Sequence, residues 1–193
     1  MRKILILATK NEFGMTDLSP WDYSALSESL SQDDWKKNVG NKVWMQGIIS
    51  EITSENNIYD IGYLELDPVD INATYDCVIL PMANIFSEIF LRFMIRRTEF
   101  LKKIKIPVYV IACGLQCRSE NELPTLVERI GKQSKDFIDA VYSTGGEFCL
   151  RGNITKEFFD MLGNNTAVVT GCPSLGGAAA YFENCVFFSK YVE

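Results

Sequence analysis

The chain has 193 residues, of which 47% are hydrophobic and 23% charged, and this is enough apolar material for one packed domain. Its formal net charge of −6 argues against a nucleic-acid-binding protein, because such proteins gain much of their affinity by neutralising phosphates. No apolar run reaches the roughly 18 residues of a membrane-spanning helix, and the first run ends at Ala8, too early for a secretory signal. We therefore expect a cytoplasmic protein that binds no nucleic acid.

Apolar runs rich in Val, Ile and Leu alternate with longer amphipathic segments, which is typical of βαβ units around a parallel sheet. Strands are predicted over residues 3–8, 58–66, 77–81, 108–113, 147–151 and 167–170. Helices are predicted over residues 41–53, 85–103 and about 122–141, and a fourth starts near Thr155 and ends at Gly163. The expected fold is a doubly wound, mostly parallel α/β domain over residues 1–175, with a long loop at 9–37 and a tail at 176–193.

A doubly wound domain holds its ligands outside the carboxyl ends of its strands. Arg151 follows a short apolar strand, so it stands at that edge of the predicted sheet. A guanidinium is a planar fork of donors that matches phosphate or carboxylate, and the helix that follows would add free backbone N–H groups. The alternative is an ion pair between Arg151 and a local carboxylate, Glu147 or Glu157.

The last predicted strand runs into the turn Gly171-Cys172-Pro173-Ser174. Glycine and proline together favour a sharp exit that leaves Ser174 exposed. A nucleophilic serine needs a base, usually histidine, and the sequence contains no histidine. Ser174 is therefore expected to donate a hydrogen bond to a ligand, or to act only as a turn residue.

The six cysteines stand at positions 77, 113, 117, 149, 172 and 185. Only Cys113 and Cys117 are close in sequence, and their spacing is not Cys-x-x-Cys. Without histidine, a zinc site would need cysteines or carboxylates alone. We therefore expect buried free thiols and no metal.

One stretch of the sequence resembles a known family. The order is Arg-Gly-x-x-Thr from Arg151, a helix ending in Leu162-Gly163, and then Val-x-Thr-Gly-Cys-Pro-Ser ending at Ser174. This order resembles the polysaccharide pyruvyl transferase family, whose enzymes move the enolpyruvyl unit of phosphoenolpyruvate onto a sugar as a ketal. The resemblance runs from about Asn38 to Leu175, and its specific part begins at Arg151.

Two further segments resemble the same family. Asn38-Val39-Gly40-Asn41 is similar to its Asn-x-Gly-Asp segment, where Gly40 lets the backbone approach a ligand and Asn38 or Asn41 can cap a helix. Asn41 stands in place of the usual aspartate, so it cannot act as a base. In the segment 112–116, Gly114 allows a turn and Gln116 could bind a hydroxyl. The segment Pro81-Met82-Ala83-Asn84 holds the corresponding place one unit earlier, where relatives tend to have glycines.

The resemblance implies phosphoenolpyruvate as donor substrate, no cofactor, and a saccharide acceptor in exopolysaccharide biosynthesis. It also implies one domain of a GT-B type glycosyltransferase fold, with the second domain of the family absent from this sequence. The expected protein partner is that missing domain or another copy of the chain in a homo-oligomer. The alternatives are a non-catalytic sugar-binding or anion-binding remnant, and a glycosyltransferase-like domain for a nucleotide sugar. The catalytic residues are unknown, and the predicted substrate-binding residues are Arg151, Thr155, Ser174, Asn38, Gly40, Asn41, Gly114 and Gln116.

The predicted helix at 85–103 is basic on one side, with six cations at positions 92, 96, 97, 102, 103 and 105. A basic amphipathic helix can lie on an anionic membrane, which would suit an enzyme that acts on lipid-linked sugars. The ordinary alternative is a helix that covers the sheet and turns a solvated cationic face outward.

Overall fold

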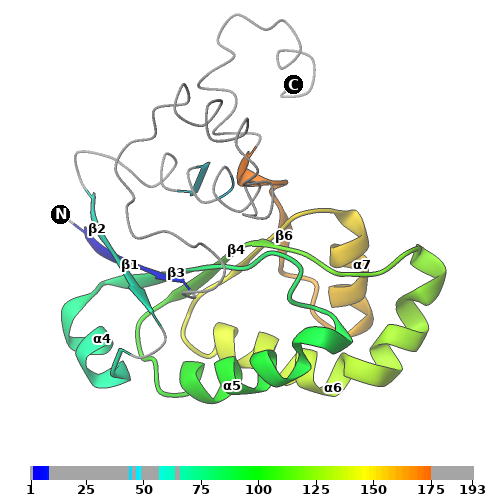
Figure 1. Cartoon of the computed structure of the whole chain (residues 1–193), viewed down its shortest axis with the longest axis horizontal. Coiled ribbons are helices and arrows are strands. Elements are labelled where there is room, and N and C mark those ends of the chain that lie inside the picture. The colour runs from blue at the N-terminus through cyan, green and yellow to red at the C-terminus, as the bar shows by residue number, and fades with distance from the viewer. Residues whose placement is uncertain (1, 9–43, 45–46, 49–56, 64–65, 175–193) are drawn as a thin grey trace, which may run out of the picture.

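The computed structural model describes residues 2–8, 44, 47–48, 57–63 and 66–174. In these residues six parallel strands form one sheet, in the order β2-β1-β3-β4-β5-β6 (Figure 1). The strands are β1 (Arg2–Ala8), β2 (Asn57–Tyr63), β3 (Cys77–Pro81), β4 (Val108–Cys113), β5 (Phe148–Leu150) and β6 (Val168–Val169). The predicted α/β class with a parallel sheet is confirmed.

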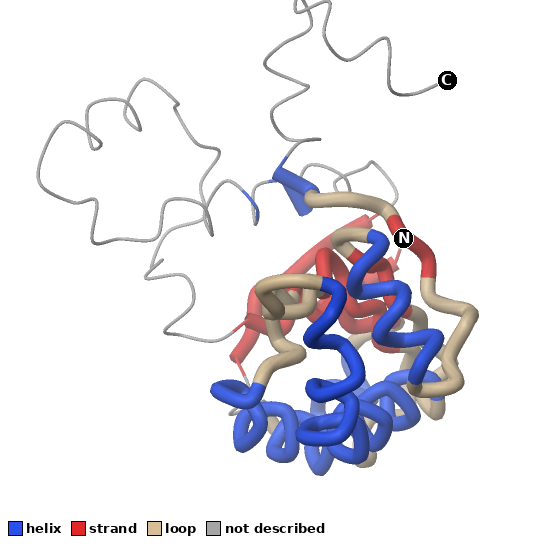
Figure 2. The backbone as a smooth tube through the Cα atoms, turned by 90° about the vertical axis from the view of Figure 1, so that its right-hand side faces the viewer, coloured by secondary structure: helices blue, strands red, loops and turns tan. Residues whose placement is uncertain are grey.

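Four helices of the described part lie on one face of the sheet, as Figures 1 and 2 show. They are α4 (Pro68–Thr74), α5 (Leu91–Leu101), α6 (Leu123–Tyr142) and α7 (Asn153–Met161). Each connects two strands while the chain steps in the same direction across the sheet, from β2 to β3, β4, β5 and β6. Right-handed crossovers place all such helices on the same face.

Apolar side chains cover both faces of the sheet, as a doubly wound fold requires. On the face under the helices, Leu5, Leu80 and Val110 are fully buried and join the main core. On the opposite face, Trp44 and Ile48 pack in one cluster with strand residues. The strand residues of that second cluster are Ile4, Ile6, Ile79 and Ala112, with Tyr59, Cys77, Tyr109 and Ile111 packed against it.

An aromatic cluster joins the helices to the sheet. Phe86 packs edge-on against Phe159 of α7 with ring centroids 5.2 Å apart, and Phe148 of β5 lies 5.1 Å from the same ring. Phe137 of α6 contacts both Phe86 and Phe148. Each of these four rings is at most 1% exposed, so together they fix α6 and α7 against β5 and the loop after β3.

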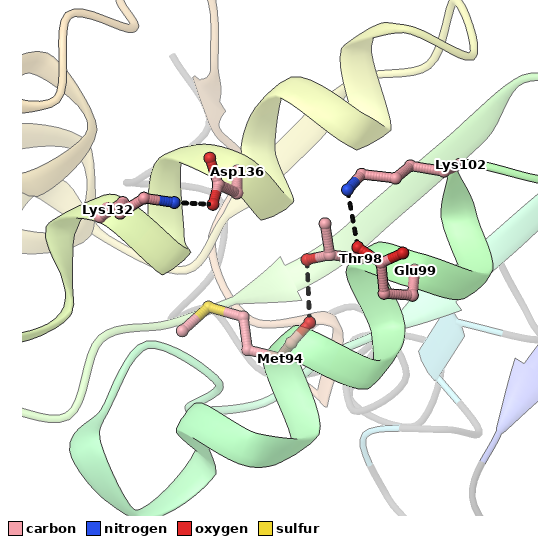
Figure 3. Close-up of polar contacts among 6 residues, drawn as sticks. All are labelled: Met94, Thr98, Glu99, Lys102, Lys132 and Asp136. Atoms are coloured by element: carbon pink, nitrogen blue, oxygen red, sulfur yellow. Dashed lines mark hydrogen bonds and ion pairs between the residues drawn. The ribbon is translucent and has the colours of Figure 1, made fainter.

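Helices α5 and α6 lie side by side (Figure 3). Thr98 is buried, and its hydroxyl donates to the carbonyl of Met94 at 2.9 Å, which satisfies it within α5. The two helices also carry exposed ion pairs, between Lys102 and Glu99 and between Lys132 and Asp136. Such exposed pairs contribute little to stability, so apolar burial holds the helices together.

The prediction of a helix over 85–103 was wrong at its start. Residues 82–87 form a loop, and the short helical turn η2 (Glu88–Phe90) precedes α5. Phe86 is buried because its ring packs against Phe137 and Phe159, and its backbone pairs with Leu115 in an isolated parallel bridge beyond the ends of β3 and β4. Ile89, which lies within the predicted helix, belongs to η2 and is 81% exposed.

Helix α4 was not predicted from the sequence. Asp67 caps it by accepting from the Val69 N–H at 2.9 Å, and Pro68 begins it. The helix has seven residues and buries only Ile71, so no apolar period indicates it. The loop 9–37, the tail 176–193 and most of the predicted helix 41–53 lie outside the described residues, although residues 44, 47 and 48 are helical. No helix in the described ranges is long and apolar enough to cross a membrane.

The close approach of Gly146 to β4 should limit what this position accepts. A Cβ added there would lie 1.8 Å from the carbonyl oxygen of Val108. We expect Gly146→Ala to lower the free energy of unfolding by about 3 kcal/mol or more, because neither backbone can move without breaking the sheet. Urea denaturation measures this.

Gly152→Ala is the matched control. Gly152 has an extended backbone with φ −170°, and a Cβ there would meet no atom within 4 Å. Its substitution should change stability by less than about 1 kcal/mol. Equal losses in the two variants would contradict the packing described here.

Candidate functional site

Arg151 is held where the loops after three neighbouring strands meet. It directly follows β5, and its backbone N–H donates to the carbonyl of Cys113 at the end of β4, at 2.8 Å. Its guanidinium Nη1 donates to Oδ1 of Asn84, in the loop after β3, at 3.2 Å. The predicted position of Arg151 at the carboxyl edge of the sheet is therefore confirmed.

Gly114 makes this convergence possible. Its N–H donates to the carbonyl of Ala83 at 2.7 Å, which ties the loop after β4 to the loop after β3. A Cβ at Gly114 would lie 2.7 Å from Oδ1 of Asn84 and 3.8 Å from Cδ of Arg151. Any side chain at position 114 would therefore displace the amide that orients the guanidinium.

The guanidinium of Arg151 keeps most of its donors available. Among the described residues its side-chain hydrogen-bond partner is Asn84, and its Nε is buried without a partner. Neither of the carboxylates considered as partners, Glu147 or Glu157, forms an ion pair with it. A guanidinium has five N–H donors, so the arrangement retains capacity for an anion.

The first turn of α7 follows Arg151 immediately. The helix begins at Asn153, two residues earlier than predicted, and Gly152 caps it without a side-chain hydrogen bond. The first backbone N–H that donates within the helix is that of Lys156, which bonds to the carbonyl of Gly152. The earlier N–H groups of a helix have no partner within it, and they carry partial positive charge. Arg151 and this turn therefore present positive potential together.

Thr155 is buried and joins two segments of the site by a hydrogen bond. Its hydroxyl oxygen accepts from the backbone N–H of Leu115 at 3.1 Å, and the residue is only 5% exposed. The contact fastens the loop after β4 to α7. A direct contact between Thr155 and a ligand stays a prediction.

Ser174 stands in the turn after β6, whose Gly171 N–H donates to the carbonyl of Leu150 at 3.2 Å. Gly171 takes the positive φ of 85° that the turn requires, and Oγ of Ser174 lies 3.0 Å from Sγ of Cys172. The carbonyl of Pro173 reaches Gly47, where an added Cβ would lie 2.0 Å from its oxygen. No contact within the described residues links Ser174 to Arg151, and its ligand-binding role stays a prediction.

Gln116 is exposed and lines an open groove of about 750 Å³ between η2 and the start of α6. Its backbone N–H donates to the carbonyl of Phe86 at 3.1 Å. The other predicted binding residues, Asn38, Gly40 and Asn41, lie outside the described residues. The sequence analysis predicted no role for Asn84. Its place directly after β3 is the signal that puts it beside the loops after β4 and β5, where it meets Arg151.

The thiol of Cys113, which lies beside the site, is unreactive because it stays protonated. Cys113 is fully buried, and burial raises the pKa of its thiol although the charge of Arg151 and the N–H of Gly114 act in the opposite direction. It therefore stays protonated and is no nucleophile. The five cysteines of the described part are free, and no group of three or more metal-ligating side chains forms there. Burial also raises the pKa of Cys77, Cys117 and Cys149.

Comparisons with protein-family models, with curated proteins and with solved structures gave no match to this chain.

The buried thiol of Cys113 predicts how stability responds to alkaline pH. Above its ordinary pKa of 9.0 the unfolded chain loses this proton while the folded chain keeps it. The free energy of unfolding should fall as pH rises above 9, by up to about 1.4 kcal/mol per pH unit from this group. Urea denaturation between pH 8 and pH 10.5 should show a shallower fall for Cys113→Ala; an unchanged slope would count against this assignment.

Proposed function

We propose that the carboxyl edge of β3, β4 and β5 binds phosphoenolpyruvate, and that this chain takes part in transferring its pyruvyl group to a sugar of a cell-surface polysaccharide. The observation that carries the proposal is the guanidinium of Arg151, oriented by Asn84 and without an ion pair in the described residues. In the chain, Arg151 directly precedes Gly152 and the first turn of α7, which has no side-chain cap. Phosphate and carboxylate, the two anionic groups of phosphoenolpyruvate, both suit such donors.

In the proposed transfer to a sugar, atoms and charges balance without a cofactor. Protonation of the methylene carbon of phosphoenolpyruvate makes C2 electrophilic, and two hydroxyls of one sugar add to C2 as its bond to the phosphate oxygen breaks. The products are a pyruvate ketal and inorganic phosphate, which together carry the two hydroxyl protons. Arg151 and the first N–H groups of α7 would neutralise the departing phosphate.

The local architecture holds the donors around Arg151 in fixed positions. Gly114 lets the loops after β3 and β4 approach so closely that Asn84 meets the guanidinium. Thr155 fixes the loop after β4 on α7, so the guanidinium and the helix start belong to one rigid unit. Such preorganised donors can stabilise negative charge without reorganising during the reaction.

A second function is an anion-binding domain that does no chemistry of its own. The observation in its favour is that no group in the described site is set up as a nucleophile or metal centre. A glycosyltransferase-like domain for a nucleotide sugar would use the same positive edge for a diphosphate.

Arg151→Ala should weaken binding of phosphoenolpyruvate at least about tenfold, because the substitution removes a charge-assisted donor pair. Isothermal titration calorimetry on the whole chain measures this, and Arg92→Ala is the matched control. Arg92 is an exposed arginine of α5, on the far side of that helix from the core. Equal affinities in the wild type and Arg151→Ala would overturn the donor site.

Release of inorganic phosphate tests the reaction itself. The chain is incubated with phosphoenolpyruvate and a panel of β-linked galactosides and N-acetylmannosamine conjugates. Release that needs both an acceptor and Arg151 supports pyruvyl transfer. Binding without release supports the anion-binding domain, and tighter binding of a nucleotide sugar than of phosphoenolpyruvate supports the glycosyltransferase-like domain.

A further inference from the structure

The contact between Asn84 and Arg151 fixes which side of the Asn84 amide is left for a ligand. Its oxygen Oδ1 accepts from Nη1 of Arg151 at 3.2 Å, and an added Cβ at Gly114 would lie 2.7 Å from the same oxygen. A guanidinium offers donors and no acceptor, so the amide oxygen, and not the amide nitrogen, must face it. A rotated amide would set N–H groups against N–H groups. The amide nitrogen Nδ2 therefore lies on the side away from this contact.

The nitrogen Nδ2 of Asn84 is an open donor. It carries two N–H groups, and none of them reaches an acceptor in the part of the chain that the structure describes. Asn84 is half-buried, yet Nδ2 is not one of its buried atoms that lack a partner, so solvent reaches it. The same is true of Nη2 of Arg151, whereas Nε of that guanidinium is buried. Two open donor groups therefore stand at the carboxyl edge, one after β3 and one after β5.

The hydrogen bond between the two side chains keeps these open donors close together. Nη2 shares a planar group with Nη1, and Nδ2 shares a planar group with Oδ1, so only the 3.2 Å contact separates the two groups. An oxyanion that accepts from both nitrogens, with hydrogen bonds of about 2.9 Å on each side, can span this distance. The arrangement suits one phosphate, sulfate or carboxylate bound by Asn84 and Arg151 together.

The neutrality of Asn84 preserves the charge of the site. A carboxylate at this position would accept from the guanidinium at least as well, but it would cancel the charge of Arg151 and repel an anion. Among the described residues no carboxylate forms an ion pair with Arg151. The amide therefore holds the guanidinium in place and leaves its full positive charge available to a ligand.

We propose that Asn84 is itself a binding residue of the anion site, and that its Nδ2 donates to the same anion that Nη2 of Arg151 binds. This role goes beyond the orientation of Arg151 by Oδ1. The inference rests on the proposed function for the identity of the anion, which would be phosphoenolpyruvate. The pair of donors itself suits any fully ionised oxyanion of this size, so inorganic sulfate serves as an independent probe.

The side-chain amide of Asn84 can report this contact directly. In nitrogen–proton correlation spectra of the isotope-labelled whole chain, its two N–H signals are identified by their loss in Asn84→Asp. Saturating sulfate should shift these signals downfield, because their protons exchange water for a charged acceptor, and phosphoenolpyruvate should do the same. Unchanged signals in the presence of a bound anion would overturn the inference, because an amide that only orients Arg151 keeps Nδ2 in water.

A double-mutant cycle separates direct contact from an effect through Arg151. Asn84→Ala should weaken sulfate binding about tenfold, because a hydrogen bond to a charged group is lost. In a chain that carries Arg151→Ala, the same substitution should still weaken binding at least about threefold. A residue that only orients Arg151 has nothing left to orient in that chain. No further loss of affinity there would therefore refute the direct contact.

Asn84→Asp tests the neutrality of the amide. The variant keeps the shape and the acceptor for Arg151, but it loses both N–H groups and adds a negative charge. Sulfate binding should fall at least about thirtyfold, further than in Asn84→Ala. Asn165→Asp is the matched control, because it adds the same charge in the exposed loop before β6, at the opposite edge of the sheet. It should change sulfate affinity by less than about twofold. Binding by Asn84→Asp as tight as by Asn84→Ala would count against the role of neutrality.

These outcomes distinguish the inference from the proposed function. If phosphoenolpyruvate binds through Arg151 while the Asn84 signals and the cycle show no contact, the proposed function stands and the role of Asn84 falls. If sulfate binds through both side chains but phosphoenolpyruvate does not bind, the donor pair stands and the proposed function falls. Absence of binding by either anion overturns both.

Discussion

The backbone hydrogen bonds that join the loops after β3, β4 and β5 determine where Arg151 and Asn84 lie. The N–H of Gly114 reaches Ala83, and the N–H of Arg151 reaches Cys113. These bonds continue the sheet pairing past the ends of the strands, so three loops far apart in sequence become one surface. The loops after β3 and β4 can lie this close only because position 114 is a glycine. Asn84 occupies the place that a side chain at position 114 would take.

This surface carries two environments with different electrostatic character. Around Arg151, a guanidinium and a helix start add their positive potentials, and no carboxylate of the described residues cancels them. In the groove, Glu88 and Arg129 neutralise each other. The rigidity of both places comes from the aromatic core beneath them.

The sequence was sufficient for the buried strands and insufficient for the contacts between loops. The bounds of β3 and β4 agree with the predicted ranges 77–81 and 108–113, because strands covered on both faces are continuous apolar runs. The start of α5 was misplaced because Phe86 is apolar for a different reason, the burial of its ring in the aromatic cluster beyond the end of β3. The partnership of Arg151 with Asn84 depends on the register of three strands, which no local pattern encodes. The open amide nitrogen of Asn84 is likewise visible only once the loops are folded.

The contact between Pro173 and Gly47 makes two distant parts of the chain mechanically dependent. With the Pro173 carbonyl seated where a side chain would otherwise stand, neither backbone can shift without displacing the other. Three residues before Gly47, the indole of Trp44 is 4% exposed against the sheet. A displacement of the turn after β6 would therefore be transmitted to an intrinsic fluorophore, which makes the emission of Trp44 a natural reporter of events at that turn.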